Sequence, residues 1–319
     1  MTDSRPQSEQ AAPSEQGRGR AGGADRPDYE VVVVGGGPAG LQAALTLGRV
    51  HRRTLLLDSG DYRNGPAQHM HNFLGFDGLP PGDLRAAART NLEAYETVEV
   101  RDVCAERTRP EGDGFRVELA DGSSVSTRGI ILATGLRDTL PEKPGLGELW
   151  GSVVAQCPYC HGHEMAGRPV AILGAEESGA HLAGIMMPVA GGLTALADGG
   201  EVDDAMPDGV RVRTEPVTRL TRTDDGVRVS FEGGEDEEYA GVLVTTGFTQ
   251  AAPFAEQLDL KMLDSGCVEI DGMGRTSLPG VHAAGDMAHT ATMAMPLASV
   301  LTAAGSGLVA ASAMTAYLL

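Results

Sequence analysis

The apolar positions of the chain gather into short continuous runs that end in glycine turns. Runs of this kind are typical of parallel strands buried on both faces. They occupy residues 29–34, 129–133, 169–173 and 241–244. After the first run, Pro38 opens a predicted helix that extends to about Gly48, and another strand follows at residues 54–57. This order predicts a strand–helix–strand unit at the start of the chain.

The same pattern occurs twice, which predicts two domains. A second strand, turn and helix begin at residue 169, between two runs that both end in Thr-Gly. We therefore predict an α/β protein with two Rossmann-like nucleotide-binding domains of the three-layer ββα type, the second inserted into the first. The expected bounds are residues 28–138 and 248–319 for the first domain and 139–247 for the inserted domain.

Composition and charge exclude several partners. The formal net charge of -19 opposes binding to nucleic acid or to an anionic membrane, because both would repel the protein. No run approaches the roughly 20 apolar residues of a membrane span. Residues 1–27, rich in Ser, Gln and Gly, lack a signal-peptide pattern and predict a disordered tail, so the chain is expected in the cytoplasm. Four cysteines are too few for a disulfide framework, and Cys104 and Cys267 are interpreted as core thiols.

The first glycine turn carries a dinucleotide-binding fingerprint. Residues 35–40 read GGGPAG between a buried strand and a helix, and they match G-x-G-x-x-G. The first glycine permits the tight turn, the second admits a pyrophosphate to the backbone, and the third lets helix and strand pack closely. The helix N-terminus adds unpaired N–H groups and a positive dipole end. The predicted cofactor-binding residues are Gly35, Gly37, Pro38, Ala39 and Gly40.

An acidic residue and a second signature extend this site. Asp58, at the end of the second strand, is expected to accept hydrogen bonds from ribose hydroxyls. The fingerprint alone leaves NAD and FAD open. Residues 278–286, LPGVHAAGD, are similar to the second flavin signature of disulfide reductases, whose aspartate binds the ribityl chain. With the turn at Thr134 and Gly135, this similarity favours FAD and implies roles for Gly285 and Asp286.

The chain ends in an Ala-rich apolar segment. We predict a buried helix from Pro296 that closes the first domain and points its N-terminus at the flavin, where its dipole would stabilise negative charge on the reduced ring. By position, Ser299 is expected to face the ring. The apolar loop at residues 287–295 is interpreted either as the lining of a small-substrate pocket or as a dimer contact.

The densest reactive chemistry lies at residues 156–164, QCPYCHGHE. A Cys-x-x-Cys pair at the start of a helix can close a small disulfide ring, and the helix dipole lowers the pKa of a thiol there. One sulfur can attack a substrate while the other faces the cofactor. We therefore predict Cys157 and Cys160 as the catalytic pair and His161 as the group that moves protons, and whether His163 shares that task stays open.

Haem attachment, zinc binding and inert packing are the other chemistries that these residue types allow. Cys-x-x-Cys-His is also the attachment pattern of c-type haem, but that chemistry normally needs export. The two cysteines and two histidines could bind zinc, but ligands crowded into so short a segment close a tetrahedron poorly, so no metal is predicted. Buried inert thiols would leave the intervening proline and the adjacent histidines without a packing reason.

The order of fingerprint, Ala-Thr-Gly turn, CxxC pair, second glycine turn and Gly-Asp signature resembles the low-molecular-weight thioredoxin reductase family across residues 28–319. The resemblance implies an FAD domain split by an inserted pyridine-nucleotide domain, and a homodimer. It implies that Cys160 lies next to the flavin and that Cys157 exchanges with substrate. It also implies cofactor contacts at Asn72 and Val103.

Two departures from the family change the expected reaction. His161 stands where the family has an acidic proton donor, which changes the acid but keeps its role. In the inserted turn, residues 174–179, Glu176 replaces the glycine that must let a pyrophosphate approach. Residues 193–201, where the family grips the 2'-phosphate of NADPH, contain no arginine or lysine. A nicotinamide cofactor is therefore not expected.

Without NADPH, electrons would run from substrate to disulfide to flavin and then to another acceptor, here molecular oxygen. Residues 157–164 look like the active-site segment of the dithiol oxidases that close the disulfides of gliotoxin and holomycin. The expectation is an FAD-dependent oxidase that forms an intramolecular disulfide in a small dithiol and produces hydrogen peroxide. The alternatives are an NADPH-dependent thioredoxin reductase, a ferredoxin-linked flavin disulfide reductase and a non-enzymatic flavin redox sensor.

Overall fold

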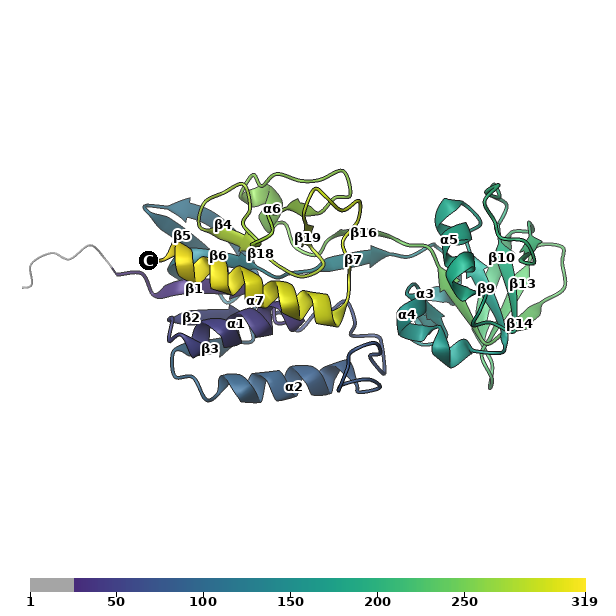
Figure 1. The fold of residues 1–319 in the computed structure, drawn as a ribbon, viewed down its shortest axis with the longest axis horizontal. Coiled ribbons are helices and arrows are strands. Elements are labelled where there is room, and N and C mark those ends of the chain that lie inside the picture. The colour runs from purple at the N-terminus through teal and green to yellow at the C-terminus, as the bar shows by residue number, and fades with distance from the viewer. Residues whose placement is uncertain (1–25) are drawn as a thin grey trace, which may run out of the picture.

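The computed structural model describes residues 26–319 and shows two lobes joined by two extended strands (Figure 1). The tail predicted at residues 1–27 lies almost wholly outside the described residues. One lobe contains the beginning and the end of the described chain, and the other is formed by the middle of the sequence (Figure 1). We call them the first domain and the inserted domain.

The first domain is built on a seven-stranded sheet. Its strands are β1 (Tyr29–Val34), β2 (Thr54–Leu57), β3 (Val98–Arg101), β4 (Ala105–Glu111), β5 (Gly114–Leu119), β6 (Ser124–Leu132) and β18 (Val281–Ala283). They are ordered β3-β2-β1-β6-β5-β4, and β18 also pairs with β6. Strands β1, β2, β3, β6 and β18 are parallel, whereas β4 and β5 run antiparallel to their neighbours.

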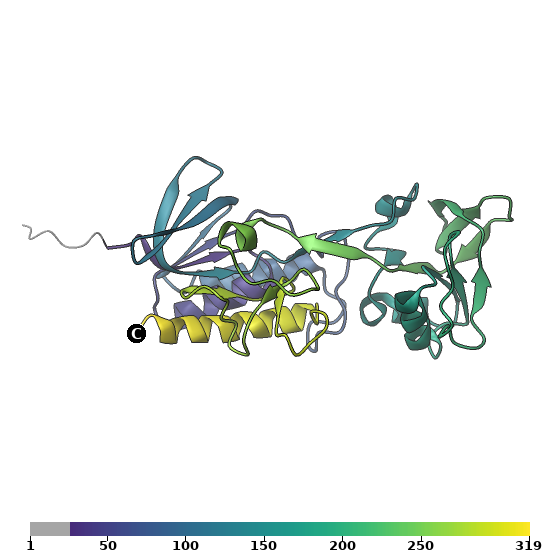
Figure 2. The same ribbon diagram turned by 90° about the horizontal axis from the view of Figure 1, so that it is seen from above.

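Different segments cover the two faces of this sheet (Figures 1 and 2). The elements are α1 (Pro38–Arg49), α2 (Pro81–Leu92) and α7 (Val300–Tyr317) on one side, and α6 (Phe254–Gln257) with the pair β17 (Val268–Glu269) and β19 (Ala288–His289) on the other. Val31 and Val33 belong to the core formed with α1 and α7, whereas Val32 and Val34 belong to the core that includes Phe254. Burial on both faces explains why the strand is continuously apolar.

The inserted domain repeats this plan on a smaller scale. Its helical elements are α3 (Leu146–Leu149), α4 (Pro158–His161), the short 3-10 helix η1 (His163–Met165) and α5 (Glu177–Met186). Its strands are β8 (Val154–Ala155), β9 (Pro169–Leu173), β10 (Gly192–Leu196), β11 (Arg211–Arg213), β12 (Val217–Arg222), β13 (Val227–Phe231), β14 (Glu237–Tyr239) and β15 (Gly241–Val244). A parallel sheet has the order β11-β10-β9-β15-β8, and an antiparallel sheet the order β12-β13-β14. The predicted fold class, two nucleotide-binding domains with one inserted into the other, is confirmed.

Two crossing strands connect the domains. They are β7 (Leu136–Thr139) and β16 (Gly247–Gln250), which pair antiparallel and place Phe248 opposite Asp138. The boundaries expected near residues 138 and 248 therefore fall within one two-stranded ribbon. Because both connections run through this ribbon, the contacts that hold the ribbon influence the orientation of the inserted domain relative to the first domain.

The closing helix differs from its prediction in start and burial. It begins at Val300, not at Pro296, and Ser299 is its N-cap, whose Oγ accepts a hydrogen bond from the backbone N of Thr302 at 3.1 Å. One face packs so tightly on α1 that a Cβ at Gly307 would lie 2.1 Å from the carbonyl oxygen of Ala39. The outer face is exposed, so the prediction of a wholly buried helix is wrong.

The length of this helix also corrects the expectation that no apolar segment is long enough to span a membrane. By length and composition, α7 is one helix of the described chain that could cross a membrane, with a mean hydropathy of 1.3 over 18 residues. Its packing against α1 shows instead a helix whose inner face completes the core of the first domain.

Candidate active site

A cavity of about 660 Å³ lies between the first domain and the inserted domain. The first glycine turn and the CxxC segment both open onto it. Of the predicted site residues, those on its wall are Gly35, Gly37, Pro38, Ala39, Asn72, Val103, Thr134, Gly285, Asp286, Ser299, Cys157, Cys160 and His161. Segments far apart in the sequence thus form one site, of a size usual for ligand pockets.

The first turn has the shape of a dinucleotide cradle. Gly35 has φ +115°, and a Cβ there would lie 2.3 Å from the carbonyl oxygen of Ala133. A Cβ at Gly40 would lie 1.8 Å from the carbonyl oxygen of Gly35, so Gly40 serves close packing behind the cavity wall. A Cβ at Gly37, the N-cap of α1, would meet nothing within 4 Å. The open space before a helix N-terminus fits a pyrophosphate, as FAD requires.

The opposite end of the cradle contains two further turns. Gly135, next to the wall residue Thr134, and Gly285 have φ +73° and +79°, values that favour glycine. The backbone N of Gly285 donates to Ser306 Oγ at 2.8 Å, which ties this turn to α7. Asp286, the residue next to Gly285, therefore reaches the cavity from a fixed backbone.

Asp58 lies behind the first glycine turn, where a Cβ at Gly36 would lie 2.0 Å from its carboxylate. Its side chain is only 2 % exposed and is not part of the cavity wall. Its carboxylate accepts hydrogen bonds from the backbone N of Gly60 (2.9 Å), from Tyr62 Oη (2.6 Å) and from Arg89 Nη2 (2.5 Å). Asp58 thus anchors the loop that follows β2, and its contact with ribose hydroxyls stays a prediction.

The CxxC pair forms a disulfide at the edge of the inserted sheet. Cys157 and Cys160 are bonded, with their Cα atoms 5.3 Å apart, and both are half-buried. The segment follows β8, and Cys157 is the N-cap of α4. Thr246 donates from Oγ1 to Gln156 Oε1 at 2.6 Å, which connects the pair to the residue before β16. The disulfide is therefore held where the crossing ribbon meets the inserted domain.

His161 is placed to exchange protons beside this disulfide. Its Nδ1 is buried and has no hydrogen-bond partner among the described residues. Burial lowers its pKa below the ordinary value, an effect that the negative charge of Glu164 opposes and that His71 reinforces. The ring is therefore neutral at neutral pH and can accept a proton.

A chain of ionisable groups crosses the domain boundary near His161. The ring of His71, on the loop after β2, has Nδ1 3.4 Å from Asp77 Oδ2 and Nε2 3.5 Å from Glu164 Oε1. His71 lines the cavity, whereas Glu164 is in the inserted domain. His71 thus connects the loop after β2 with the segment that contains the CxxC pair.

The cavity wall also contains residues that sequence reasoning missed or misjudged. Cys104 is exposed and lines the cavity, so its interpretation as a core thiol is wrong, whereas Cys267 is fully buried as predicted. Arg63 and Asp138 lie on the wall and form an ion pair. No motif contains them, because their importance depends on contacts between distant segments.

The second glycine turn is closed by its own side chain. Glu176 is the N-cap of α5, and its Oε1 accepts hydrogen bonds from Thr245 Oγ1 at 2.7 Å and Ser178 Oγ at 2.9 Å. Burial tends to raise the pKa of Glu176, but the hydrogen bonds from Thr245, from Ser178 and from nearby backbone N–H groups together outweigh it, and the pKa is lowered. A carboxylate thus lies at the helix end where the fold would bind a pyrophosphate.

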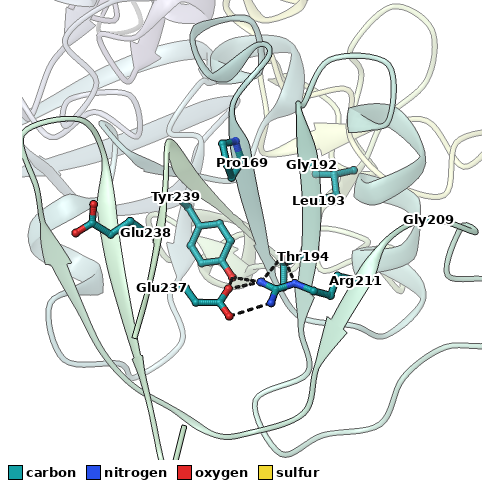
Figure 3. A pocket seen from close by; sticks show the side chains of 9 residues that line it. All are labelled: Pro169, Gly192, Leu193, Thr194, Gly209, Arg211, Glu237, Glu238 and Tyr239. Atoms are coloured by element: carbon teal, nitrogen blue, oxygen red, sulfur yellow. Dashed lines mark hydrogen bonds and ion pairs between the residues drawn. The ribbon is translucent and has the colours of Figure 1, made fainter. Parts of the chain in front are cut away.

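A second pocket, of about 490 Å³, lies at the N-terminal ends of β9, β10 and β11 in the inserted domain (Figure 3). Arg211 reaches into it, but its guanidinium is paired with Glu237 and also donates to Thr194 Oγ1 at 3.1 Å (Figure 3). Burial and the hydrogen bond to Glu237 raise the pKa of Tyr239 to about 12. The cation of this pocket is therefore already paired, and its phenol is un-ionised at neutral pH.

A dinucleotide cradle and a disulfide on one cavity define a nucleotide-dependent disulfide oxidoreductase. The chain belongs to the pyridine nucleotide-disulphide oxidoreductase family, which matches residues 29–307. This family binds FAD, and the chain is a flavin-containing thiol/disulfide oxidoreductase of the thioredoxin reductase type.

Individual relatives agree with this assignment. "Thioredoxin reductase aclD" of Aspergillus oryzae is 32 % identical over 299 residues, covering 88 % of this chain and 94 % of that protein. "Thioredoxin reductase sirT" of Leptosphaeria maculans is 30 % identical over 308 residues, covering 89 % and 92 %. The crystal structure of HlmI superposes with a TM-score of 0.82 and 33 % identity, covering 91 % of this chain and 92 % of that one. The resemblance to thioredoxin reductases seen in the sequence is therefore confirmed.

Proposed function

We propose that this protein is an FAD-dependent dithiol oxidase that closes an intramolecular disulfide in a small dithiol and passes the electrons to O2, giving H2O2. The observation that carries the proposal is the contrast between the two nucleotide turns. The first opens onto the cavity that contains the disulfide, whereas the second is occupied by Glu176.

The second turn argues against NADPH as the electron donor. A pyrophosphate at α5 would have to displace the Glu176 carboxylate, break its bonds to Thr245 and Ser178, and approach a like charge. After β10, Asp198 pairs with Lys143 at 2.6 Å, so an acidic residue replaces the basic cluster that a 2'-phosphate needs. In this proposal the electrons come from the thiol substrate.

The thiol chemistry proceeds by two exchanges at the protein disulfide. A substrate thiolate attacks Cys157 Sγ, which breaks the Cys157–Cys160 bond and forms a mixed disulfide with Cys157. The second substrate thiolate attacks the substrate sulfur of that mixed disulfide, so the product disulfide leaves and both protein cysteines are reduced. When bound, FAD supplies a two-electron acceptor for this dithiol and can be reoxidised by O2.

His161 moves one of the two protons that the substrate thiols lose, and the other passes to solvent. Its neutral ring accepts one proton as the substrate thiol becomes a nucleophile, and returns it to a leaving cysteine thiolate. The charges of Glu164 and His71 act on His161, and the ring of His71 lies between the exposed carboxylates of Glu164 and Asp77, which supports proton exchange with solvent near this position.

The cavity wall near the disulfide supports a small substrate. Tyr159, between the two cysteines, lines the cavity and is 67 % exposed, and Trp150 and His69 lie on the same wall. The resemblance of residues 157–164 to dithiol oxidases of gliotoxin and holomycin supports the same class of substrate.

A second copy of the chain is the proposed protein partner. The outer face of α7 and the loop before it expose apolar side chains, among them Met295 (52 %), Leu297 (67 %), Leu301 (51 %) and Leu308 (47 %). A row of this kind is typical of a subunit interface. Sedimentation at micromolar concentration tests it, since a monomer would contradict the proposal.

The decisive experiment separates the electron sources. Under anaerobic conditions a small dithiol such as dithiothreitol should bleach the flavin absorbance, air should restore it with release of H2O2, and NADPH should leave it unchanged. Rapid bleaching by NADPH would indicate a thioredoxin reductase instead. Reduction by ferredoxin, or tight FAD without repeated turnover on any dithiol, would favour the other two alternatives.

Matched cysteine variants test the assignment of the redox pair. Cys157→Ser and Cys160→Ser should each abolish turnover, because neither can re-form the disulfide. Cys104→Ser is the control, since this exposed thiol lines the same cavity without a disulfide partner, and it should keep near-normal turnover. Activity retained in either of the first two variants would contradict the mechanism.

A further inference from the structure

One arginine joins three segments at the cavity wall. Arg63 lies on the loop between β2 and α2, and its side chain is 18 % exposed. Its Nε and Nη2 donate to the two carboxylate oxygens of Asp138 at 2.9 and 2.6 Å, and its Nη1 donates to Asp286 Oδ2 at 2.9 Å. Asp138 is on the crossing strand β7, whereas Asp286 follows β18.

All three guanidinium nitrogens of Arg63 donate hydrogen bonds to these two carboxylates. The two parallel bonds to Asp138 fix its plane, and the third arm then points at Asp286. The side chains of Asp138 and Asp286 are 7 % and 21 % exposed, so water cannot easily replace the arginine. Loss of Arg63 would leave two carboxylates of like charge facing one cavity.

Asp286 depends on this arrangement. Burial raises the pKa of Asp286, and the charge of Arg63 counteracts that effect, while Asp138 adds to it. Arg63 thereby favours an ionised carboxylate with a fixed orientation, and one of the two oxygens of Asp286 remains available to accept hydrogen bonds from a ligand in the cavity.

We propose that Arg63 is a positioning residue that fixes Asp286 for the ribityl chain of FAD and ties this contact to β7, so that cofactor binding and the orientation of the inserted domain are coupled. The proposal rests on the FAD site proposed above. It makes the loop after β2 the link between the cofactor and the crossing ribbon.

A neighbouring ion pair serves as the control for the pair of Arg63 and Asp138. Arg137, also on β7, donates from Nη2 to Asp61 Oδ2 at 2.7 Å, so it joins the same strand to the same loop. The side chains of Arg137 and Asp61 are 65 % and 71 % exposed, however, and exposed ion pairs contribute little. Asp61→Asn therefore breaks a loop-to-strand contact as Asp138→Asn does, but without touching Arg63.

The test is FAD titration of the apoprotein, followed by quenching of flavin fluorescence. Arg63→Gln should weaken FAD binding at least about tenfold, because a charge-assisted contact and a fixed acceptor are both lost. Arg63→Lys keeps the charge without the fork and should fall between wild type and Arg63→Gln. Asp138→Asn should weaken binding about threefold or more if β7 is coupled to the cofactor, and Asp61→Asn should change it less than about twofold.

A structural measurement complements the affinities. Small-angle scattering of wild type should show a narrower distribution of interdomain distances with FAD than without, and Asp138→Asn should lose that difference. Wild-type affinity in both Arg63→Gln and Asp138→Asn would overturn the proposal. If Arg63→Gln fails to fold, Asp138→Asn and Arg63→Lys decide the outcome. Failure of the wild-type apoprotein to bind FAD would instead contradict the proposed function.

Discussion

The two glycine turns, at residues 35–40 and 174–179, have nearly the same backbone conformation, but only the first leaves the helix N-terminus open to a ligand. Gly35 and Gly174 have φ +115° and +118°. The helix N-caps that follow, Gly37 and Glu176, have φ/ψ of -76°/-177° and -71°/-179°. The third glycine of each turn packs against the first, since Cβ atoms at Gly40 and Gly179 would lie 1.8 and 2.3 Å from the carbonyl oxygens of Gly35 and Gly174.

The difference between the turns is therefore a side chain and not a conformation. The backbone at the middle position suits any residue, so glycine at position 37 serves only to leave space and to keep negative charge away. At position 176 the carboxylate accepts hydrogen bonds from Thr245 and Ser178 and lies where a pyrophosphate would have to bind. Two turns with the same backbone thus differ in whether a ligand can approach the helix N-terminus.

The largest expected effect comes from making the first turn like the second. Gly37→Glu should fold, because a Cβ at Gly37 meets nothing within 4 Å, and it should place a carboxylate beside the pyrophosphate site. We expect FAD affinity to fall at least about 100-fold, corresponding to about 3 kcal/mol of bulk and like-charge repulsion. Equilibrium titration of the apoprotein with FAD measures this.

Gly37→Ala is the matched control for bulk without charge. Because the position is open and the backbone conformation is allowed, the alanine variant should fold and lose far less affinity than the glutamate variant. Equal losses in both variants would mean that close backbone approach, and not charge, distinguishes the two turns.

The comparison also shows which features a sequence can reveal. The strand β1 and its glycine turn follow from a local pattern, and so do the CxxC disulfide and the Glu176 substitution. The hydrogen bonds of Asp58 could not be predicted, because its partners Tyr62 and Arg89 come from a loop and a helix further along the chain. Arg63 was missed because its partners are 75 and 223 positions away. Contacts of that range leave no periodicity in the sequence.

The domains should also differ in their resistance to acid. His282, on β18 of the first domain, is 2 % exposed and neither ring nitrogen has a hydrogen-bond partner among the described residues. Burial, reinforced by Arg275 and opposed by Asp271, lowers its pKa to about 4. The unfolded chain binds this proton near pH 6.5 and the folded chain does not, so stability is lost as the pH falls from 6.5 to 4.

The expected loss is about 3 kcal/mol in the free energy of unfolding over that interval. In the inserted domain His163 and His181 are exposed, and burial lowers the pKa of His161 by less than that of His282, so the first domain should unfold first in acid. Chemical denaturation at pH 6.5 and at pH 4 measures the loss, and His282→Phe should remove most of it. An identical pH dependence in wild type and variant would assign the acid sensitivity to other groups.

The smallest expected effect is the reciprocal change in the second turn. Glu176→Ala removes the carboxylate that occupies the N-terminus of α5, whereas Glu177→Ala removes the same charge one residue later, where no hydrogen bond holds it. We expect dinucleotide binding to improve about tenfold in the first variant, or about 1.4 kcal/mol, and to stay nearly unchanged in the second.

The affinities for NADH and NADPH should rise equally, because Asp198 and the missing basic residues still offer nothing to a 2'-phosphate. Calorimetric titration with both nucleotides decides the point, and no gain in Glu176→Ala would show that the second turn is closed by more than this one side chain.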